Sequence, residues 1–291
     1  MATPPDRLLR RLEWRLSRRL DGRLTGAYRT VWRGAGLDFT DLREYVPEDD
    51  VRHIDWNVTA RLDEPYVRQY TEDREMTAWL VVDRSASMRA AKAAVTTELA
   101  VGLARLVSRN GNRIGAVLYD NHEHRVVPPR AGRDQVLRIA RELMRPGRAG
   151  FSPATTDLAA MLRLAAATTA RRRGLVLVMS DFIGDPGWDR PLGMLAHRHE
   201  VVVLRVVDPA ELDLPDLGVV LVEDAETGEQ LLVDTGDPLL RDRLAAEVAA
   251  REAEVAGGMR RAGVDAYRVD TAADPVATLV DLVRRSGRGR R

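Results

Sequence analysis

The stretch TAWLVVDRSAS, residues 77–87, decides the fold of this chain. Residues 77–82 form an apolar run of strand length, and the run ends at Asp83. A run without polar alternation is typical of a strand that is buried on both faces of a sheet. We therefore expect a central strand here, with Ser85 and Ser87 in the loop that follows it.

The same pattern recurs along the chain and predicts an α/β fold. We predict further strands at residues 113–119, 125–127, 175–180, 201–207 and 265–269. We predict helices between and after them at residues 88–108, 134–144, 157–167, 188–197, 238–261 and 275–284. Residues 219–222 and 230–233 flank turn residues and predict a hairpin. Alternating strands and helices predict a doubly wound, mostly parallel sheet with helices on both faces.

The N-terminal part of the chain has a different texture. Residues 7–24 predict an amphipathic helix with many arginines. We favour a helix docked on its own domain over one that binds a membrane or an acidic partner. Residues 34–75 show no clean period, and their aromatic residues are expected to pack this extension onto the neighbouring domain. We divide the chain into an N-terminal extension (1–75), an α/β domain (76–285) and a disordered basic tail (286–291).

Composition excludes several classes of protein. The chain has 291 residues and no cysteine, so disulfides, thiolate zinc sites and cysteine nucleophiles are excluded. Its 45 basic and 44 acidic residues nearly balance, so a nucleic-acid partner is not expected from net charge. No apolar run is long enough to span a bilayer, and the N-terminus lacks a signal peptide. We expect a cytoplasmic protein.

Oxygen-bearing side chains follow the predicted strands. Asp83 and Asp181 each end a strand, and Ser85 and Ser87 follow the first of them. Ligands of such sheets bind at the carboxyl ends of the strands, where the strand order reverses. Carboxylates and hydroxyls suit Mg²⁺ or Mn²⁺ better than Zn²⁺. The simpler alternative is that Asp83 and Ser85 only cap the next helix.

The D-x-S-x-S pattern of residues 83–87 resembles the metal-ion-dependent adhesion site of von Willebrand factor A domains. The resemblance implies that Ser85 and Ser87 bind the metal directly, and that Asp83 and Asp181 bind it largely through water. A partner protein would donate a Glu or Asp as the remaining ligand. Many such sites have a small residue where Arg84 stands, and Arg84 could pair with that carboxylate or point to solvent.

A threonine before a helix completes the resemblance. Thr155 and Thr156 both precede the predicted helix, where a threonine is also a natural N-cap. We choose Thr156, because residues 156–158 match the Thr-Asp-Leu run of the family better. The resemblance implies that Thr156 binds the metal directly or through water.

A second motif lies in the N-terminal extension, at residues 42–61. It resembles a bacterial von Willebrand factor A-like family of uncharacterised proteins, the domain of unknown function fifty-eight. Genes of this family often neighbour those of MoxR-type AAA+ ATPases. The family usually has Gly where Glu48 stands. We expect the extension to buttress the domain or to form a second contact surface, and its candidate partner-binding residues are Arg43, Glu44, Tyr45, Asp49, Asp50, Asp55 and Trp56.

The resemblance implies a non-enzymatic adaptor that works with a MoxR-type AAA+ ATPase in complex assembly or chaperone-like activity. One alternative is a Mg²⁺-dependent hydrolase, which would need a nucleophile with a base or a second metal nearby. The other is binding of nucleic acid or an anionic membrane through the arginine-rich termini, which a steep salt dependence would reveal.

Overall fold

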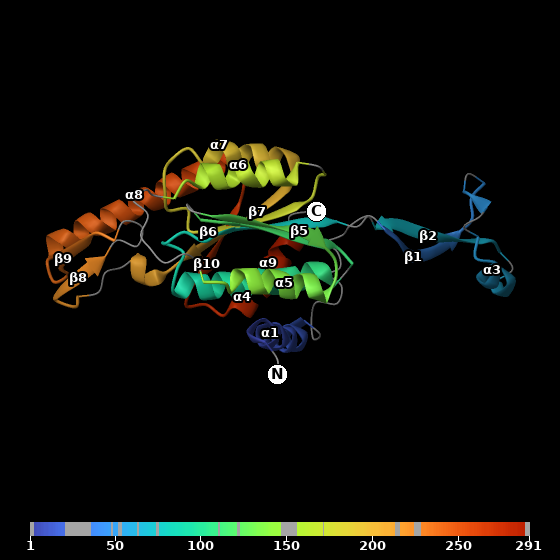
Figure 1. Ribbon diagram of the computed structural model, residues 1–291. Coiled ribbons are helices and arrows are strands. Elements are labelled where there is room, and N and C mark those ends of the chain that lie inside the picture. The colour runs from blue at the N-terminus through green and yellow to red at the C-terminus, as the bar shows by residue number, and fades with distance from the viewer. Residues whose placement is uncertain are drawn as a thin grey trace.

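A six-stranded sheet lies at the centre of the structure, which is a computed structural model (Figure 1). The structure describes residues 3–20, 36–47, 49–51, 54–62, 64–73, 76–109, 111–120, 123–146, 156–170, 172–212, 216–223 and 228–288. The strand order is β10-β7-β6-β3-β4-β5, and only β5 runs antiparallel to its neighbour. These strands are β3 (Thr77–Asp83), β4 (Arg113–Tyr119), β5 (His124–Arg130), β6 (Leu175–Ser180), β7 (Glu200–Val207) and β10 (Ala266–Asp270). The predicted doubly wound sheet is confirmed.

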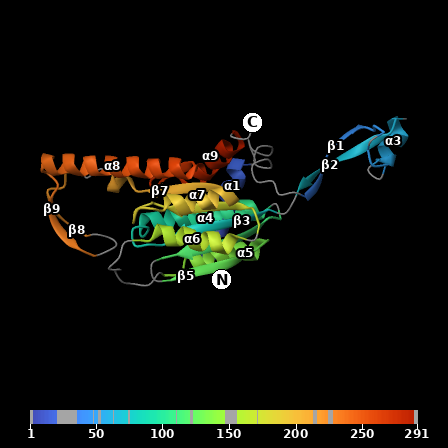
Figure 2. The same cartoon turned by 90° about the horizontal axis from the view of Figure 1, so that it is seen from above.

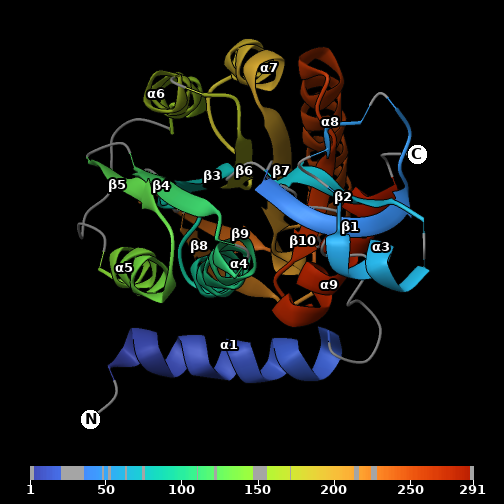
Figure 3. The same cartoon turned by 90° about the vertical axis from the view of Figure 1, so that its right-hand side faces the viewer.

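Helices cover both faces of this sheet (Figure 3). One face carries α4 (Ala91–Ser108), α5 (Arg133–Leu143) and α9 (Pro275–Arg288), and the other carries α6 (Leu158–Thr169), α7 (Asp189–Arg198) and α8 (Pro238–Ala262). Alternate residues of β3 point to opposite faces of the sheet. Leu80 and Val82 belong to the first core, which lies under α4, α5 and α9, while Trp79 and Val81 belong to the second core, under α6, α7 and α8. This burial on both faces explains the unbroken apolar run in the sequence.

The N-terminal helix α1 (Pro4–Leu20) packs outside α4, α5 and α9 (Figure 3). Leu9 and Leu12 are fully buried in the first core. Arg11 forms an ion pair with Glu98 of α4. The favoured interpretation, a basic helix docked on its own domain, is therefore confirmed for the described residues.

Strand β5 is longer than predicted. The strand predicted at residues 125–127 continues through Pro128 and Pro129 to Arg130. The strand lies at the edge of the sheet, and its register with β4 shifts between Ile114 and Ala116. Proline is tolerated at such an edge because no further strand needs its missing N–H group.

Residues 36–73 form a small lobe rather than an irregular extension. Strands β1 (Gly36–Glu44) and β2 (Tyr66–Asp73) pair antiparallel, and the short helix α3 (Trp56–Leu62) lies between them in sequence. We call this unit the N-terminal lobe. It projects from the amino end of β3 (Figures 1 and 2), and its extensive contacts are internal. The expectation that its aromatic residues pack on the domain fails for Trp56, whose surface is 68% exposed.

A second projection leaves the opposite end of the sheet. The predicted hairpin is present as β8 (Val219–Glu223) and β9 (Gln230–Asp234), and α8 leads from it back to the sheet (Figure 2). Helix α9 ends at Arg288, four residues beyond the predicted helix, so the first residues of the expected disordered tail are helical. No helix in the described ranges is long and apolar enough to cross a membrane.

Candidate metal centre

The candidate site lies where the strand order of the sheet reverses. From β3 the chain adds β4 and β5 on one side, and it then returns to add β6 on the other side of β3. The carboxyl ends of β3 and β6 therefore meet at the switch point, which is where such sheets bind ligands. Asp83 ends β3, and Asp181 directly follows the last residue of β6, Ser180, so the two predicted carboxylates come together.

Asp83 is buried and held by two hydrogen bonds. The backbone N–H of Ser85 donates to its Oδ1 at 2.9 Å, and the Ser180 hydroxyl donates to its Oδ2 at 2.6 Å. Burial, and then the nearby charge of Asp181, raise the pKa of Asp83 to about 7. A nearby cation would stabilise the ionised form of Asp83, because its positive charge would offset both the cost of burial and the repulsion from Asp181.

The two serines of the motif lie side by side. Ser85 Oγ and Ser87 Oγ are 3.1 Å apart. Adjacent oxygens around an octahedral Mg²⁺, at its usual bond length, are about 2.9 Å apart. The two hydroxyls therefore fit neighbouring positions on one ion, although their mutual hydrogen bond also accounts for the distance.

Asp181 has an internal cation as its partner. The ammonium group of Lys92 lies 2.8 Å from Asp181 Oδ2 and 2.6 Å from Glu211 Oε2. Only 1% of the surface of Lys92 is exposed. Burial lowers the pKa of Lys92, but the two carboxylates outweigh it and raise the pKa overall, so the lysine stays charged. The other oxygen of Asp181 accepts the backbone N–H of Ile183 at 2.9 Å.

Thr156 is fully buried beside the loop that follows Asp181. Its carbonyl oxygen accepts the backbone N–H of Asp185 at 3.4 Å, and a Cβ added to Gly184 would lie only 2.4 Å from it. The two loops are thus in direct contact. Asp157 caps α6 by accepting the N–H of Ala160 at 2.7 Å, so the capping role does not fall to Thr156. Thr155 lies outside the described residues.

These residues fit a hard divalent cation in part. Ser85, Ser87 and Asp83 provide oxygens on one loop, and Thr156 lies on a neighbouring loop. Asp181 fits less well as a ligand, since Lys92 already compensates its charge. Within the described residues, no three carboxylate or imidazole groups gather at one place, so an ion here depends on hydroxyl ligands.

Arg84 has partners within its own domain. Its guanidinium group donates to the carbonyl oxygens of Arg145 at 2.6 Å and Glu142 at 3.4 Å, at the C-terminal end of α5. Carbonyl oxygens at the C-terminal end of a helix carry a partial negative charge, which attracts a cation. The guanidinium group therefore does not point freely to solvent, and its pairing with a partner's carboxylate stays a prediction.

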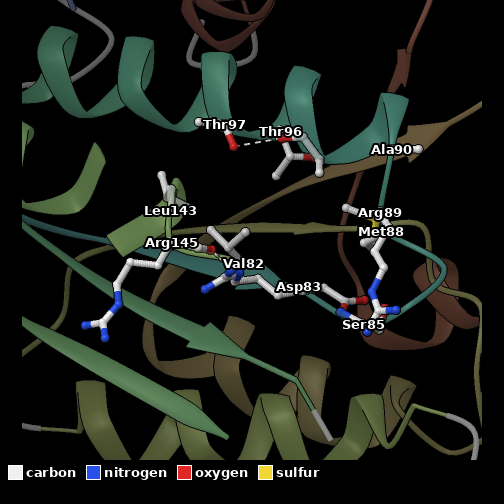
Figure 4. A pocket seen from close by; sticks show the side chains of 12 residues that line it. Val82, Asp83, Ser85, Met88, Arg89, Ala90, Thr96, Thr97, Leu143 and Arg145 are labelled. Carbon is white, nitrogen blue, oxygen red and sulfur yellow. Dashed lines mark hydrogen bonds between the residues drawn. The ribbon is translucent and has the colours of Figure 1, made fainter. Parts of the chain in front are cut away.

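A pocket of about 380 Å³ opens beside the site (Figure 4). Asp83 and Ser85 line one side of it, and Arg89 lies next to them in Figure 4. Thr96 lines the α4 side, and its buried hydroxyl has no hydrogen-bond partner among the residues that the structure describes. The pocket gives a side chain from another molecule a route to Ser85 and Asp83.

The candidate partner-binding residues of the N-terminal lobe lie at the other end of β3. Arg43 Nη1 binds Asp49 Oδ2 at 2.7 Å, and Asp55 accepts the N–H of Asn57 at 3.0 Å at the start of α3. These three therefore have roles within the lobe. Exposed positions of the set are Glu44, Asp50 and Trp56, and Tyr45 is half-buried.

Sequence reasoning missed three residues that shape the site. Lys92 and Glu211 are far apart in sequence, and no motif joins them to Asp181. Ser180 precedes the strand-end aspartate, but only the structure shows that its hydroxyl binds Asp83. One signal was available: Lys92 is the single lysine among 45 basic residues.

Comparison with curated proteins finds uncharacterised mycobacterial relatives. The protein Rv1480 of Mycobacterium tuberculosis is 39% identical over 288 residues, which cover 97% of this chain and 89% of the relative. The protein MAV169 of Mycobacterium avium is 39% identical over 163 residues, which cover 56% of this chain and 95% of the relative. Neither name states a function.

Comparison with solved structures finds several remote matches. BatB from Bacteroides thetaiotaomicron matches with 15% identity and a TM-score of 0.47, covering 72% of this chain and 98% of that one. The von Willebrand factor domain of the pilus tip protein Mfa5 from Porphyromonas gingivalis matches with 13% identity and a TM-score of 0.39, covering 74% and 96%.

The family follows from the sequence match. Residues 41–254 match the family described as Protein of unknown function DUF58, which is most of the α/β domain and part of the lobe. The sheet order and the two helical layers give the chain a von Willebrand factor A-like fold. The chain therefore belongs to the DUF58 family.

Proposed function

We propose that this chain is a non-enzymatic, metal-dependent adaptor that binds other proteins. Ser85 and Ser87 would hold Mg²⁺ or Mn²⁺ directly, with Thr156 beside them, and Asp83 and Asp181 would hold it through water. When bound, the ion supplies a positive centre that accepts a carboxylate from a partner protein. The observation that carries the proposal is the 3.1 Å separation of the two serine hydroxyls beside the buried Asp83.

The surrounding residues support binding better than catalysis. Both oxygens of Asp83 accept hydrogen bonds from Ser85 and Ser180, which holds the carboxylate in one orientation. A hydrolase would need an activated nucleophile with a base or a second metal within reach. In the described residues, the ammonium group of Lys92 is bound by Asp181 and Glu211, so it is not available as a general base.

A MoxR-type AAA+ ATPase is the partner that we propose. The support is membership of the DUF58 family, whose genes often neighbour those of MoxR-type AAA+ ATPases. The AAA+ protein would donate a Glu or Asp to the ion through the pocket of Figure 4. Assembly of complexes or a chaperone-like activity is the corresponding role.

Binding of a purified MoxR-type ATPase from the same genome tests this proposal. We expect binding in Mg²⁺, a loss of at least tenfold in affinity in EDTA, and the same loss for Ser85→Ala. Thr97→Ala is the matched control, since this hydroxyl lines the same pocket but bonds to the Ala93 carbonyl at 2.7 Å. It should leave affinity within twofold of wild type.

Two results would overturn the proposal. One is a wild-type protein that binds neither Mg²⁺ nor Mn²⁺ by calorimetry. The other is metal-dependent turnover of a phosphoester that Ser85→Ala abolishes, which would identify a hydrolase instead.

A further inference from the structure

The β8–β9 hairpin exposes an unusual amount of apolar surface. Val219, Leu221 and Leu232 are 62%, 61% and 69% exposed. Leu221 pairs directly with Leu232, and residues two apart on a strand share a face, so the three side chains point to the same side. Leu231 and Val222 are also exposed on the opposite face. A two-stranded sheet with this much exposed apolar surface is marginal in water on its own.

The base of the hairpin is nevertheless firmly held. Thr235 is fully buried, its hydroxyl accepts the N–H of Leu217 at 2.8 Å, and its backbone N–H donates to the Gly218 carbonyl at 2.9 Å. Asp237 then caps α8 by accepting the N–H of Leu239 at 2.9 Å. The apolar face is thus presented in a defined orientation (Figures 1 and 2).

The segment of sequence that contains the hairpin carries charge of a single sign. Residues 206–240 contain ten carboxylates and no Lys, Arg or His, although the whole chain has 45 basic and 44 acidic residues. Glu223 and Asp234 are exposed at opposite ends of β8 and β9. Like charges around an apolar face repel an acidic partner and attract a basic one.

We propose that the β8–β9 hairpin is a docking surface for a protein segment with apolar side chains flanked by arginine or lysine. The apolar side chains would cover Val219, Leu221 and Leu232, and the basic groups would face the carboxylates at the rim. Uncovered apolar patches with a polar rim are typical of protein-binding sites. This surface contains no candidate metal ligand, so the inference goes beyond the metal-dependent function and does not rest on it.

The hairpin also lies close to the metal centre along the chain. Glu211, in the turn between β7 and β8, binds Lys92, which in turn binds Asp181. A second copy of this chain is the competing occupant, because α1 exposes Trp14 among arginines.

Two synthetic peptides test the proposal on the full chain by fluorescence anisotropy. Both carry the same apolar Val/Leu segment, which is flanked by arginines in one and by glutamates in the other. We expect the arginine peptide to bind at least tenfold more tightly. The double variant Leu221→Ser/Leu232→Ser should weaken its binding at least tenfold, and Glu223→Lys should weaken it severalfold. Binding should persist in EDTA, which separates this surface from the metal centre.

Matched controls use equally exposed residues elsewhere. Met194 of α7 is 63% exposed, and Glu200 is exposed at the start of β7. Met194→Ser and Glu200→Lys should leave peptide binding within twofold, and circular dichroism should show every variant folded.

Equal binding of the two peptides, or wild-type binding by the double variant, would overturn the proposal. Sedimentation measurements test the competing occupant. A wild-type dimer that both Leu221→Ser/Leu232→Ser and Trp14→Ser dissociate would assign the surface to a second copy and would also overturn it.

Discussion

Lys92 places a fixed positive charge beside a candidate site for a divalent ion. Its ammonium group is buried between Asp181 and Glu211. A compact ammonium on a flexible stem can fit between two carboxylates where a planar guanidinium would demand more room. The lysine therefore holds Asp181 in place without a metal ion. Its positive charge also repels a divalent ion that approaches the site.

Replacing Lys92 with Met should tighten Mn²⁺ binding about tenfold or more, because unit charges a few ångströms apart in a protein interact by several kcal/mol. The same change should destabilise the metal-free protein by about 3–5 kcal/mol, since Asp181 loses its partner while buried. Titration calorimetry and chemical unfolding measure the two effects.

The double variant Lys92→Met/Asp181→Asn is the control for folding. It removes both charges, so it should recover most of the lost stability. Comparison with Asp181→Asn alone isolates the effect of the lysine, because both proteins then lack the carboxylate. Mn²⁺ affinity that is the same with and without Lys92 in both backgrounds would contradict this account.

The raised pKa of Asp83 makes stability depend on pH. In the unfolded chain this carboxyl group ionises near its ordinary value of 3.8, whereas in the folded protein its pKa is about 7. The folded state thus binds the extra proton between these values, so metal-free stability should fall as pH rises from about 4 to about 7 and then level off. Melting curves across this range, with and without Mg²⁺, measure the effect.

Mg²⁺ should favour the ionised form, so the increase in melting temperature that it causes should grow over the same pH range. Asp83→Asn is the matched control, because an amide keeps the shape but cannot ionise. A wild-type profile that coincides with that of Asp83→Asn would show that Asp83 does not titrate in this way.

At the scale of elements, the buried strands were the most predictable. Residues 113–119 and 175–180 form strands with the predicted bounds, because burial on both faces leaves an uninterrupted apolar run. The helices shift by a few residues at their ends, where capping decides the boundary. Helix α4, for example, begins at Ala91 and not at Met88.

The strands of the N-terminal lobe and the full length of β5 were not predicted. Strands β1 and β2 rest on pairing with each other, and their sequences show no clean apolar period, whereas the β8–β9 hairpin was predictable from the turn residues between its strands. Pro128 and Pro129 are compatible with a strand only because β5 lies at the sheet edge. The position of a strand within a sheet is a tertiary property, which local sequence does not carry.

The candidate site was predictable only in its local parts. Residues 83–87 lie on one loop, and Asp181 follows a recognisable strand, so the topology rule brings them together. The ion pairs of Lys92 and the carbonyl contacts of Arg84 join elements that are distant in sequence. Both sets of contacts depend on how distant elements pack together, and no spacing in the sequence predicts them.

At the scale of the whole molecule, the exposed features lie at opposite ends along the direction of β3. The N-terminal lobe joins the amino end of this strand, while Asp83 and the β8–β9 hairpin lie toward the carboxyl end (Figure 2). Seven residues of strand span roughly 20 Å. A partner that contacts both ends must therefore span at least this distance.

The lobe should be dispensable for folding of the α/β domain. None of its described apolar side chains belongs to either core cluster of the domain, and Trp56 is exposed. Replacing residues 36–73 with a Gly/Ser linker of equal length should leave the main melting temperature within about 2 °C and Mg²⁺ binding unchanged, because the cores stay intact.

Binding of the AAA+ partner should weaken if the lobe is its second contact surface, and Trp56→Ala in the full chain should reproduce part of that loss without changing stability. A fall of more than about 10 °C on replacement would show instead that the lobe buttresses the domain, as a substantial shared core would require.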